Sequence, residues 1–551
     1  MHTCQRMMRA LAISALFGGL VGCSADPGVD APPTLEITSP QRGTTIQGDS
    51  VEVTGVVTDD HDHVKVMINQ TEVTPAKDGT FTATVPVGAG ISILETHAID
   101  SGGSDVRDVR AVLAGTLATS DGTHAAPVGA HVGVQAFAKI AGALEATIKA
   151  MDFTAAVQSM NPVYNNTGCL GATINITSVT IADVGMSLVP KTGALTTAVT
   201  LDDVTVKLHA SFKVACIGGS TNITVHSTHA HVNGDLGLAV AGGKLTSSLA
   251  SPAVTLDGFS IDVGGVPGAI ESLLSGQARS AAENALTKAI KDKVPPLADA
   301  ALAGLTAKPF SANLLGHPTK ITIAPAKADL SADGLMFSVD SKVAVTGGEG
   351  GMYVSLPSPM SASLMQSHGV GVAIADDLVN QLFSGLWAAG AIDQTVPLDS
   401  KLAVVASLLD ADAKSLAISL ALPPTISGDG TDLALSIGDL MISVKDGSGA
   451  EIQKLALSVR TTLSAGPTQS GGMTLTVGQP KLYAQVLVQS DDSPLTADRV
   501  EGIVGGAWGL IGGQADSALA NLPMPSVAGM QLGAPSIEGR SGYVFADVPL
   551  K

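Results

Sequence analysis

The feature that most constrains the fold is a run of alternating polar and apolar residues from Val204 to Cys216, in which every even-numbered residue is apolar. Alternation with a period of two is typical of a strand with one buried face. At about 3.3 Å per residue the run spans roughly 43 Å, well beyond the usual strand. It therefore predicts a long, curved sheet. Asn233-Gly234 predicts a hairpin between two further strands.

Two helical patterns accompany these strands. In one, apolar residues recur at steps of three and four from His131 to Met151. The other opens at Val266-Pro267, and we expect Pro295-Pro296 to end it. A second series of strands follows Pro309. Because helices and long strands occur twice, the sequence predicts an α+β fold with a coarse internal repeat.

Residues 34–114 have a different pattern. Short strands alternate with turn residues at regular spacing, which predicts an all-β sandwich. The turns Ser39-Pro40 and Asp78-Gly79 stand where bacterial immunoglobulin-like modules place theirs, so the stretch resembles such a module. Residues 23–33 form a polar, Pro-rich tether ahead of it.

The segment from His368 to Ile392 has the pattern of a strand followed by a helix. Asp376 is placed to cap the helix and Gly390 to end it. The segment resembles the start of the C-terminal half of the bactericidal/permeability-increasing and lipopolysaccharide-binding protein family, and residues 522–544 resemble that family's closing strands. The resemblance implies two tandem tubular modules, 117–310 and 311–551, each a long twisted antiparallel sheet wrapped on a long helix, with an elongated pocket for acyl chains.

The apolar faces of the helices supply the candidate lipid-binding residues. A helix in a solid core would show the same stripes. The low aromatic content of 3% favours a pocket, because large aromatic side chains usually fill a solid core. The candidates are Phe137, Ile140, Leu144, Ile270, Leu273, Val379, Leu382, Phe383 and Leu386.

The N-terminus has the layout of a secretory signal, with Arg6 and Arg9 ahead of an apolar run from Ala10 to Val21. The run is shorter than the roughly 20 residues that cross a bilayer. Leu20-Val21-Gly22-Cys23 resembles the bacterial lipobox, which implies cleavage after residue 22 and lipidation of Cys23. An ordinary signal with a chance cysteine is the alternative. Ser24 favours sorting to the outer membrane.

Charge and cysteine content limit the partners. A net charge of −19 disfavours nucleic acid and a broad lipopolysaccharide-binding patch, because both present phosphates. Lys288, Lys291 and Lys293 form a local basic group, which we assign to the end of a helix. Cys169 and Cys216 remain in an exported chain, so we expect a structural disulfide between them.

The sequence contains no hydrolase nucleophile elbow, zinc-protease motif or phosphate loop, so we expect neither an enzyme nor a cofactor. Two groups of polar residues could be metal sites or ordinary solvated surface side chains. Asp59, Asp60 and Asp62 could hold calcium at a strand end. His229 and His231 share a strand face and could bind a metal with His226 or Asp235. In both cases we favour solvated side chains and predict no metal.

These patterns predict a membrane-anchored bacterial lipoprotein that binds, and could transfer, a phospholipid or another elongated apolar molecule. The driving force would be burial of acyl surface, at about 25 cal/mol per Å². The alternative is a cell-surface adhesion or scaffold protein that contacts a protein partner through the immunoglobulin-like module.

Overall fold

The computed structural model describes residues 31–60, 64–266, 268–303, 310–356, 365, 367, 369–398, 408–429, 432–467, 473–490, 495–506, 508, 536–540 and 542–549. Within them the chain forms two compact units, residues 31–38, 54–83 and 96–108 in one and residues 39–53, 84–95 and 109–549 in the other. The predicted signal segment, Cys23 and the closing residues 522–530 lie outside the described residues.

The predicted N-terminal β-sandwich is confirmed. One sheet has the order β1-β3-β6 and the other β2-β8-β7-β4-β5. Alternation buries one face of each strand, and a Cβ at Gly55 would lie only 2.5 Å from the Phe81 ring. The strands are β1 (Thr34–Ser39), β2 (Thr44–Gln47), β3 (Ser50–Thr58), β4 (Lys65–Ile68), β5 (Thr71–Val73), β6 (Thr80–Pro86), β7 (Gly90–Ile99) and β8 (Asp105–Gly115).

A long antiparallel sheet, which we call the first curled sheet, follows in the order β11-β12-β14-β15-β16, with β13 on β14 and β17 on β15. Its longest strands have 21 and 25 residues, so the predicted long strand is present and extends further than expected. The strands are β11 (Tyr164–Asn165), β12 (Leu170–Thr180), β13 (Asp183–Lys191), β14 (Ala194–Val214), β15 (Ile217–Ala241), β16 (Lys244–Asp257) and β17 (Ser260–Val263).

The hairpin predicted at Asn233-Gly234 is wrong. Asn233 lies inside β15 and pairs with Ala198 on one side and Ala253 on the other. The register shifts next to Gly234, so this glycine lies at a bulge rather than a turn. Neighbouring strands on both sides of β15 outweigh the local turn preference. The turn between β14 and β15 falls instead at Ala215-Cys216, where the predicted disulfide joins Cys216 to Cys169.

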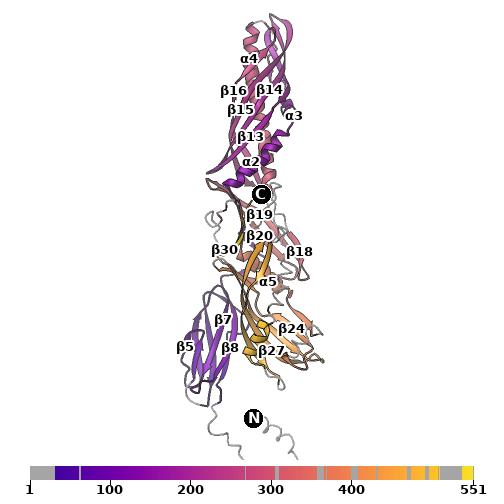
Figure 1. The fold of residues 1–551 in the computed structure, drawn as a ribbon. Coiled ribbons are helices and arrows are strands. Elements are labelled where there is room, and N and C mark those ends of the chain that lie inside the picture. The colour runs from indigo at the N-terminus through magenta and orange to yellow at the C-terminus, as the bar shows by residue number, and fades with distance from the viewer. Residues whose placement is uncertain are drawn as a thin grey trace, which may run out of the picture. The chain divides into compact units, whose positions relative to one another are not determined.

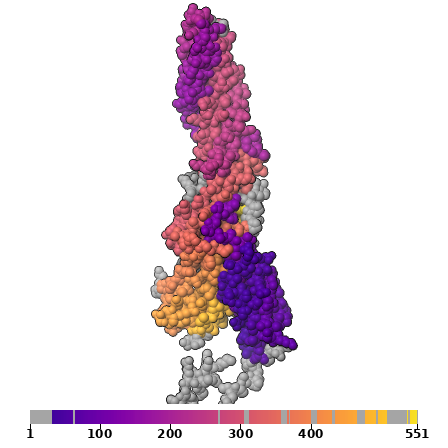
Figure 2. Space-filling view, turned by 180° about the vertical axis from the view of Figure 1, so that it is seen from behind, coloured from indigo at the N-terminus to yellow at the C-terminus, as the bar shows by residue number. Residues whose placement is uncertain are grey.

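Helices α2 (Val134–Lys149), α3 (Phe153–Val157) and α4 (Gly268–Leu302) pack on the first curled sheet (Figure 1). Their apolar faces meet the inward residues of β12–β16 in one continuous core. From behind, the surface of α4 runs beside that of residues 150–200 (Figure 2). The predicted apolar stripe of α2 is therefore confirmed as a core-facing stripe.

The predicted end of the second helix at Pro295-Pro296 is wrong. Helix α4 continues through both prolines to Leu302. A proline removes one helical N–H donor and usually bends or ends a helix. Here Val294, Ala298 and Leu302 are buried against the core on both sides of the prolines, so packing outweighs the lost bonds. The basic group consequently lies within the helix rather than at its end, and Lys288 pairs with Asp292 at 2.6 Å.

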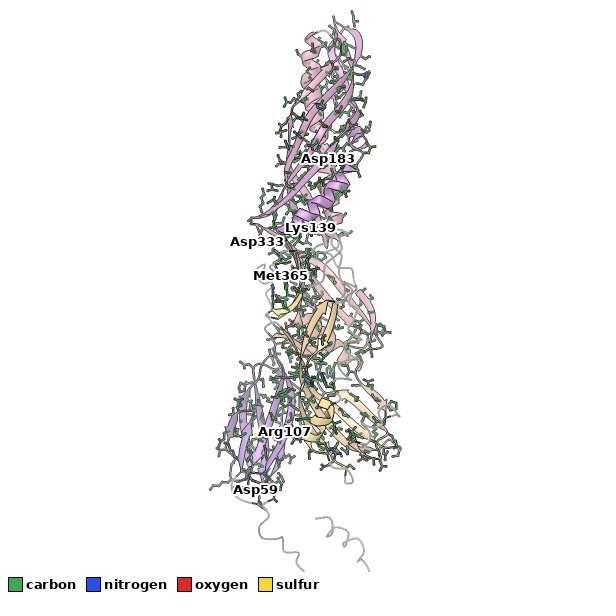
Figure 3. The ribbon with its side chains drawn as sticks, viewed as in Figure 1. Asp59, Arg107, Lys139, Asp183, Asp333 and Met365 are labelled. Atoms are coloured by element: carbon green, nitrogen blue, oxygen red, sulfur yellow. A yellow bond between two sulfur atoms is a disulfide. The ribbon has the colours of Figure 1, made fainter. Side chains whose placement is uncertain are left out.

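A central sheet follows, in the order β18-β19-β20-β10-β22-β31-β30. Strand β10, from the predicted module 117–310, pairs with β20 and β22 from the predicted module 311–551, so the two share this sheet. Met365, labelled in Figure 3, packs on it with Tyr543 and Phe545. The strands are β10 (Thr123–Gly133), β18 (Phe310–Leu314), β19 (His317–Ser331), β20 (Gly334–Val345), β22 (Val370–Ala375), β30 (Ser536–Arg540) and β31 (Tyr543–Val548).

The last sheet, which we call the second curled sheet, has the order β23-β24-β26-β27-β28, with β25 on β26 and β29 on β27. Helix α5 (Asp376–Ala388) packs near it, and β9 (Leu117–Thr119) pairs separately with β21 (Met352–Val354). The strands are β23 (Gln394–Pro397), β24 (Ser415–Leu420), β25 (Thr425–Asp429), β26 (Asp432–Lys445), β27 (Glu451–Pro467), β28 (Met473–Val477) and β29 (Lys481–Val488).

The predicted fold class is confirmed, because a β-sandwich precedes curled antiparallel sheets that pack with helices. Among the described residues, no helix is both long and apolar enough to cross a membrane.

Candidate functional site

The predicted lipid-binding residues of the first curled sheet lie together in its core. Phe137, Ile140 and Leu144 on α2 are at most 5% exposed, and Ile270 on α4 is fully buried. Leu273 is partly buried and packs against the same cluster. The structure therefore brings these five side chains into one apolar interior, formed by helices on one side and strands on the other.

The predicted apolar residues of α5 divide between two clusters. Leu382 and Leu386 pack with Val343 and Val345 of β20. Val379 and Phe383 pack against a different cluster, which includes Ile426 of β25. Of the four predicted residues, only Leu386 is buried, with 5% of its surface exposed. We expected one apolar face that lines a pocket. Instead the four residues form two faces, one against the central sheet and one against the second curled sheet.

The most buried side of α5 is polar. Asp376, Asp377, Asn380, Gln381 and Ser384 are at most 2% exposed. They recur at helical spacing, a stripe that sequence analysis alone would assign to solvent. In the fold, this side of the helix meets strand ends and turns, whose backbone groups need hydrogen-bond partners.

Three of these side chains hydrogen-bond to backbone. Asn380 pairs with Ile426 in both directions, donating from Nδ2 to its carbonyl at 2.9 Å and accepting from its N–H at 2.7 Å. Gln381 donates to the Gly122 carbonyl at 2.7 Å, and Ser384 donates to the Met352 carbonyl at 2.8 Å. Side chains of α5 therefore join β25, β21 and the turn before β10.

The start of α5 carries two buried carboxyls. The prediction that Asp376 caps the helix is wrong, because the N-cap is Ala375 and makes no side-chain cap. Asp376 instead accepts a hydrogen bond from the Gly428 N–H at 2.6 Å. Burial raises the pKa of Asp376 to about 6, with the charge of Asp377 adding to the rise.

The predicted end of α5 at Gly390 is confirmed. The Ala391 N–H donates to the Leu386 carbonyl just past Gly390, whose φ is +71°.

Asp377 belongs to a small polar cluster. It accepts from the Leu356 N–H at 2.8 Å and from the Ser355 hydroxyl at 3.1 Å, and His124 Nε2 lies 3.5 Å from its Oδ2. Burial raises the pKa of Asp377 in spite of these contacts. Burial, followed by the charge of Asp377, also raises the pKa of Tyr353 to about 12.

A cavity of about 530 Å³ lies beside α5. This volume is within the roughly 300–1,000 Å³ typical of small-molecule sites. Ile91, Val354, Leu356 and Ile426 supply apolar wall, while hydroxyls and two cations supply a polar side. Asn380 reaches the cavity from α5, whereas the four predicted α5 residues are not part of its lining. The cavity can therefore accept an amphipathic molecule.

Sequence analysis missed the polar side of this cavity. Thr425, Ser436, Arg460 and Lys481 are direct cross-strand partners in succession, on β25, β26, β27 and β29. Directly paired residues project from the same sheet face, so the four side chains form one row, and all four line the cavity. The local signal is one cation at an exposed position of β27 and one at an exposed position of β29. Only strand pairing shows that the two cations are adjacent.

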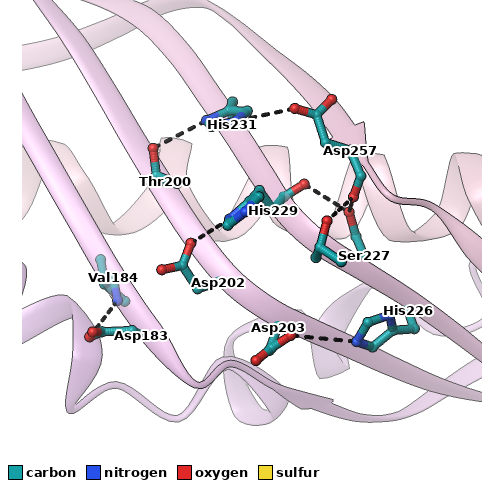
Figure 4. A network of polar contacts seen from close by, with 11 residues as sticks. Asp183, Val184, Thr200, Asp202, Asp203, His226, Ser227, His229, His231 and Asp257 are labelled. Carbon is teal, nitrogen blue, oxygen red and sulfur yellow. Dashed lines mark hydrogen bonds and ion pairs between the residues drawn. The ribbon is translucent and has the colours of Figure 1, made fainter.

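The histidine candidates lie on the outer face of the first curled sheet (Figure 4). His226, His229 and His231 each contact a different carboxylate, of Asp203, Asp202 and Asp257 respectively, at 3.7, 2.8 and 3.4 Å. Asp235 pairs with Lys191 instead. Within the described parts of the chain, no group of three or more His, Cys, Asp or Glu side chains could hold a metal ion. Asp62, from the calcium candidate, lies outside those parts.

Comparison with known proteins gives two kinds of likeness. The family model "Glucodextranase, domain B" matches residues 33–115, which coincide with the predicted immunoglobulin-like strands. Among solved structures, lipopolysaccharide binding protein is similar over 78% of this chain and 99% of its own, with a TM-score of 0.45 and 14% identity. It is a member of the family that the sequence resembles.

Two other solved structures are similar at much lower TM-scores. The fibronectin(III)-like modules of Clostridium thermocellum CbhA cover 34% of this chain and 92% of their own, with a TM-score of 0.13 and 12% identity. A tetra-tandem repeat from a large adhesion protein covers 83% and 99%, with a TM-score of 0.14 and 11% identity. No curated protein sequence matches the chain. At these values the solved structures transfer no ligand or activity to this protein.

Proposed function

We propose that this protein is a membrane-anchored lipoprotein that binds a phospholipid or another elongated amphipathic molecule reversibly, for storage or transfer. The observation that carries the proposal is the cavity beside α5. It combines apolar wall from Ile91, Val354 and Ile426 with polar groups along one side, the arrangement that small-molecule sites use to bury one end of a ligand and orient the other. Burial of acyl surface would drive binding, at about 25 cal/mol per Å².

Two further features agree with this proposal. The curled sheets pack with helices that present long apolar faces, and the α2 and α4 residues predicted to contact lipid meet in one interior. The lipobox-like segment before Cys23 supports anchoring by acyl chains, because several chains tether a protein far more durably than one.

Ligand retained by the protein tests the binding proposal. We expect mass spectrometry of the chain, purified without detergent exchange, to detect an acyl lipid in near-stoichiometric amount. The lipid should be released by organic extraction. Protein that carries no lipid, and takes none up from vesicles, would contradict lipid binding and favour the adhesion or scaffold alternative.

Fractionation tests the anchoring proposal. In Cys23→Ala the acyl acceptor is lost, so we expect the protein to move from the membrane fraction to the soluble fraction. Cys4→Ala is the matched control, because residue 4 leaves with the signal and its replacement should not alter fractionation. A Cys23→Ala protein that still sediments with membranes would show that another feature holds it there.

A further inference from the structure

The row of cavity-lining residues on the second curled sheet places two cations next to each other. Arg460 of β27 and Lys481 of β29 are direct cross-strand partners. Like charges at directly opposed positions of a sheet repel one another and reduce stability. The whole chain has 30 basic residues against 49 acidic ones, so adjacent basic residues on one cavity wall are not what its composition favours.

Other contacts hold the two cations in place. Arg460 donates from Nη2 to the Ile91 carbonyl at 3.2 Å, and the Lys481 ammonium lies 4.8 Å from the centre of the Tyr483 ring. Tyr483 raises the pKa of Lys481, as does the nearby Glu95 carboxylate, while the charge of Arg460 acts to lower it. These contacts hold both side chains in position.

Hydroxyl groups extend the row on the side of Arg460. Ser436 is the cross-strand partner of Arg460, and Thr425 is the partner of Ser436. Hydroxyls beside a guanidinium and an ammonium are the donors that bind phosphate or carboxylate oxygens, with Arg giving the directional contact and Lys the point charge. The apolar wall, which includes Ile91 and Ile426, faces the same cavity.

We propose that Arg460 and Lys481 bind the anionic head group, phosphate or carboxylate, of the amphipathic molecule whose apolar part occupies the cavity. This inference rests on the proposed lipid-binding function and specifies the chemical class of the ligand. An anion between the two side chains relieves their mutual repulsion, which explains why the sheet keeps them paired.

The test uses the full mature chain, stripped of lipid, and calorimetric titration with probes of equal acyl length. Lysophosphatidic acid and a fatty acid carry the two anionic heads, monoacylglycerol is the neutral counterpart, and inorganic phosphate is the head alone. We expect Arg460→Gln and Lys481→Gln each to weaken binding of the anionic lipids by about tenfold or more, since each removes a charge-assisted hydrogen bond. Monoacylglycerol affinity should change by less than about twofold.

Lys454→Gln is the matched control. Lys454 lies on the same strand as Arg460, pairs with Glu451 and is not among the cavity-lining residues. The Lys454→Gln variant loses one positive charge, as the other two variants do. If net charge alone mattered, its affinity for the anionic lipids would fall by the same factor, and we expect that affinity to stay unchanged. Thermal unfolding of all variants shows whether the fold is kept.

The outcomes separate this inference from the function on which it rests. Variants that bind anionic and neutral lipids as the parent does would overturn the head-group site and leave lipid binding standing. A parent that binds phosphate through Lys481 but none of the lipids would retain the anion site and contradict lipid binding. A parent that binds none of the four probes would overturn both.

Discussion

Helices α4 and α5 both pack against long antiparallel strands, yet they bury opposite kinds of side chain. Helix α4 turns Ile270, Leu274, Ala278 and Ala285 into an apolar core. Helix α5 buries two carboxyls, two amides and a hydroxyl. The difference follows from what each helix meets. The partner of α4 is the inner face of a sheet, whereas that of α5 is largely backbone at strand ends and turns.

The two helices also differ in how closely their neighbours pack against them. Apolar side chains between a helix and a sheet face interdigitate at close to crystal density. A helix fixed by side-chain bonds to backbone holds its neighbours at set distances. Close approach is enforced there, since a Cβ at Gly348 would lie 2.2 Å from the Gly385 carbonyl. The cavity that Asn380 lines, with its apolar and polar walls, lies beside α5, the helix whose position is fixed by hydrogen bonds to backbone.

The largest effect should come from a charge in the apolar interface. Ile270→Asp puts a carboxylate where exposure is 0%, with apolar neighbours on every side. We expect a loss of about 5 kcal/mol or more, because an unpaired buried charge has no compensating partner. Thermal unfolding would measure it, with the exposed Ser280→Asp on the same helix as control. Equal stability of the two variants would show that the α4 interior is hydrated rather than closed.

A smaller loss should follow from removing one amide of the polar interface. Asn380→Leu keeps the volume of the side chain but leaves the Ile426 N–H and carbonyl without partners in a buried position. Two unsatisfied buried groups predict a loss of about 4 kcal/mol. Denaturant unfolding would measure this against Asn313→Leu, an exposed site on β18. A stabilised Asn380→Leu would mean that α5 tolerates an apolar face after all.

The smallest effect is a pH dependence of the free energy of unfolding, which we expect from the buried polar side of α5 and not from the apolar face of α4. The folded pKa of Asp376, about 6, lies above the ordinary value of 3.8, so the folded chain binds more protons between these values. The contribution of this group to stability is therefore present below pH 4 and lost as pH rises through 6, by about 3 kcal/mol in all. Asp377 shifts in the same direction.

Asp376→Asn isolates this contribution from the other titrating groups. The variant should be more stable than the parent at pH 7, since it buries no charge, and the difference should vanish near pH 4. Denaturant unfolding at several pH values measures it, with Asp262→Asn, an exposed site on β17, as control. A difference that stays constant across pH would show that the Asp376 carboxyl does not titrate in this range.

Local sequence determined the elements themselves. Alternation in residues 204–216 specified a strand, and the stripe from Val134 to Ile148 specified α2, because side-chain period depends only on backbone geometry. The two cysteines Cys169 and Cys216 specified a disulfide, and the turn-rich strands of 34–114 specified the sandwich. In each case, one stretch or one residue type was sufficient.

Tertiary structure alone decided which elements meet, and pairing changed several local assignments. Asn233-Gly234 became a bulge because strands flank β15 on both sides, and Pro295-Pro296 remained inside α4 because the core continues past them. The polar stripe of α5 became its buried side because backbone groups lay opposite it. Arg460 and Lys481, 21 positions apart in sequence, became neighbours only through the register of β27 with β29, since periodicity fixes the face of a side chain but not its partner.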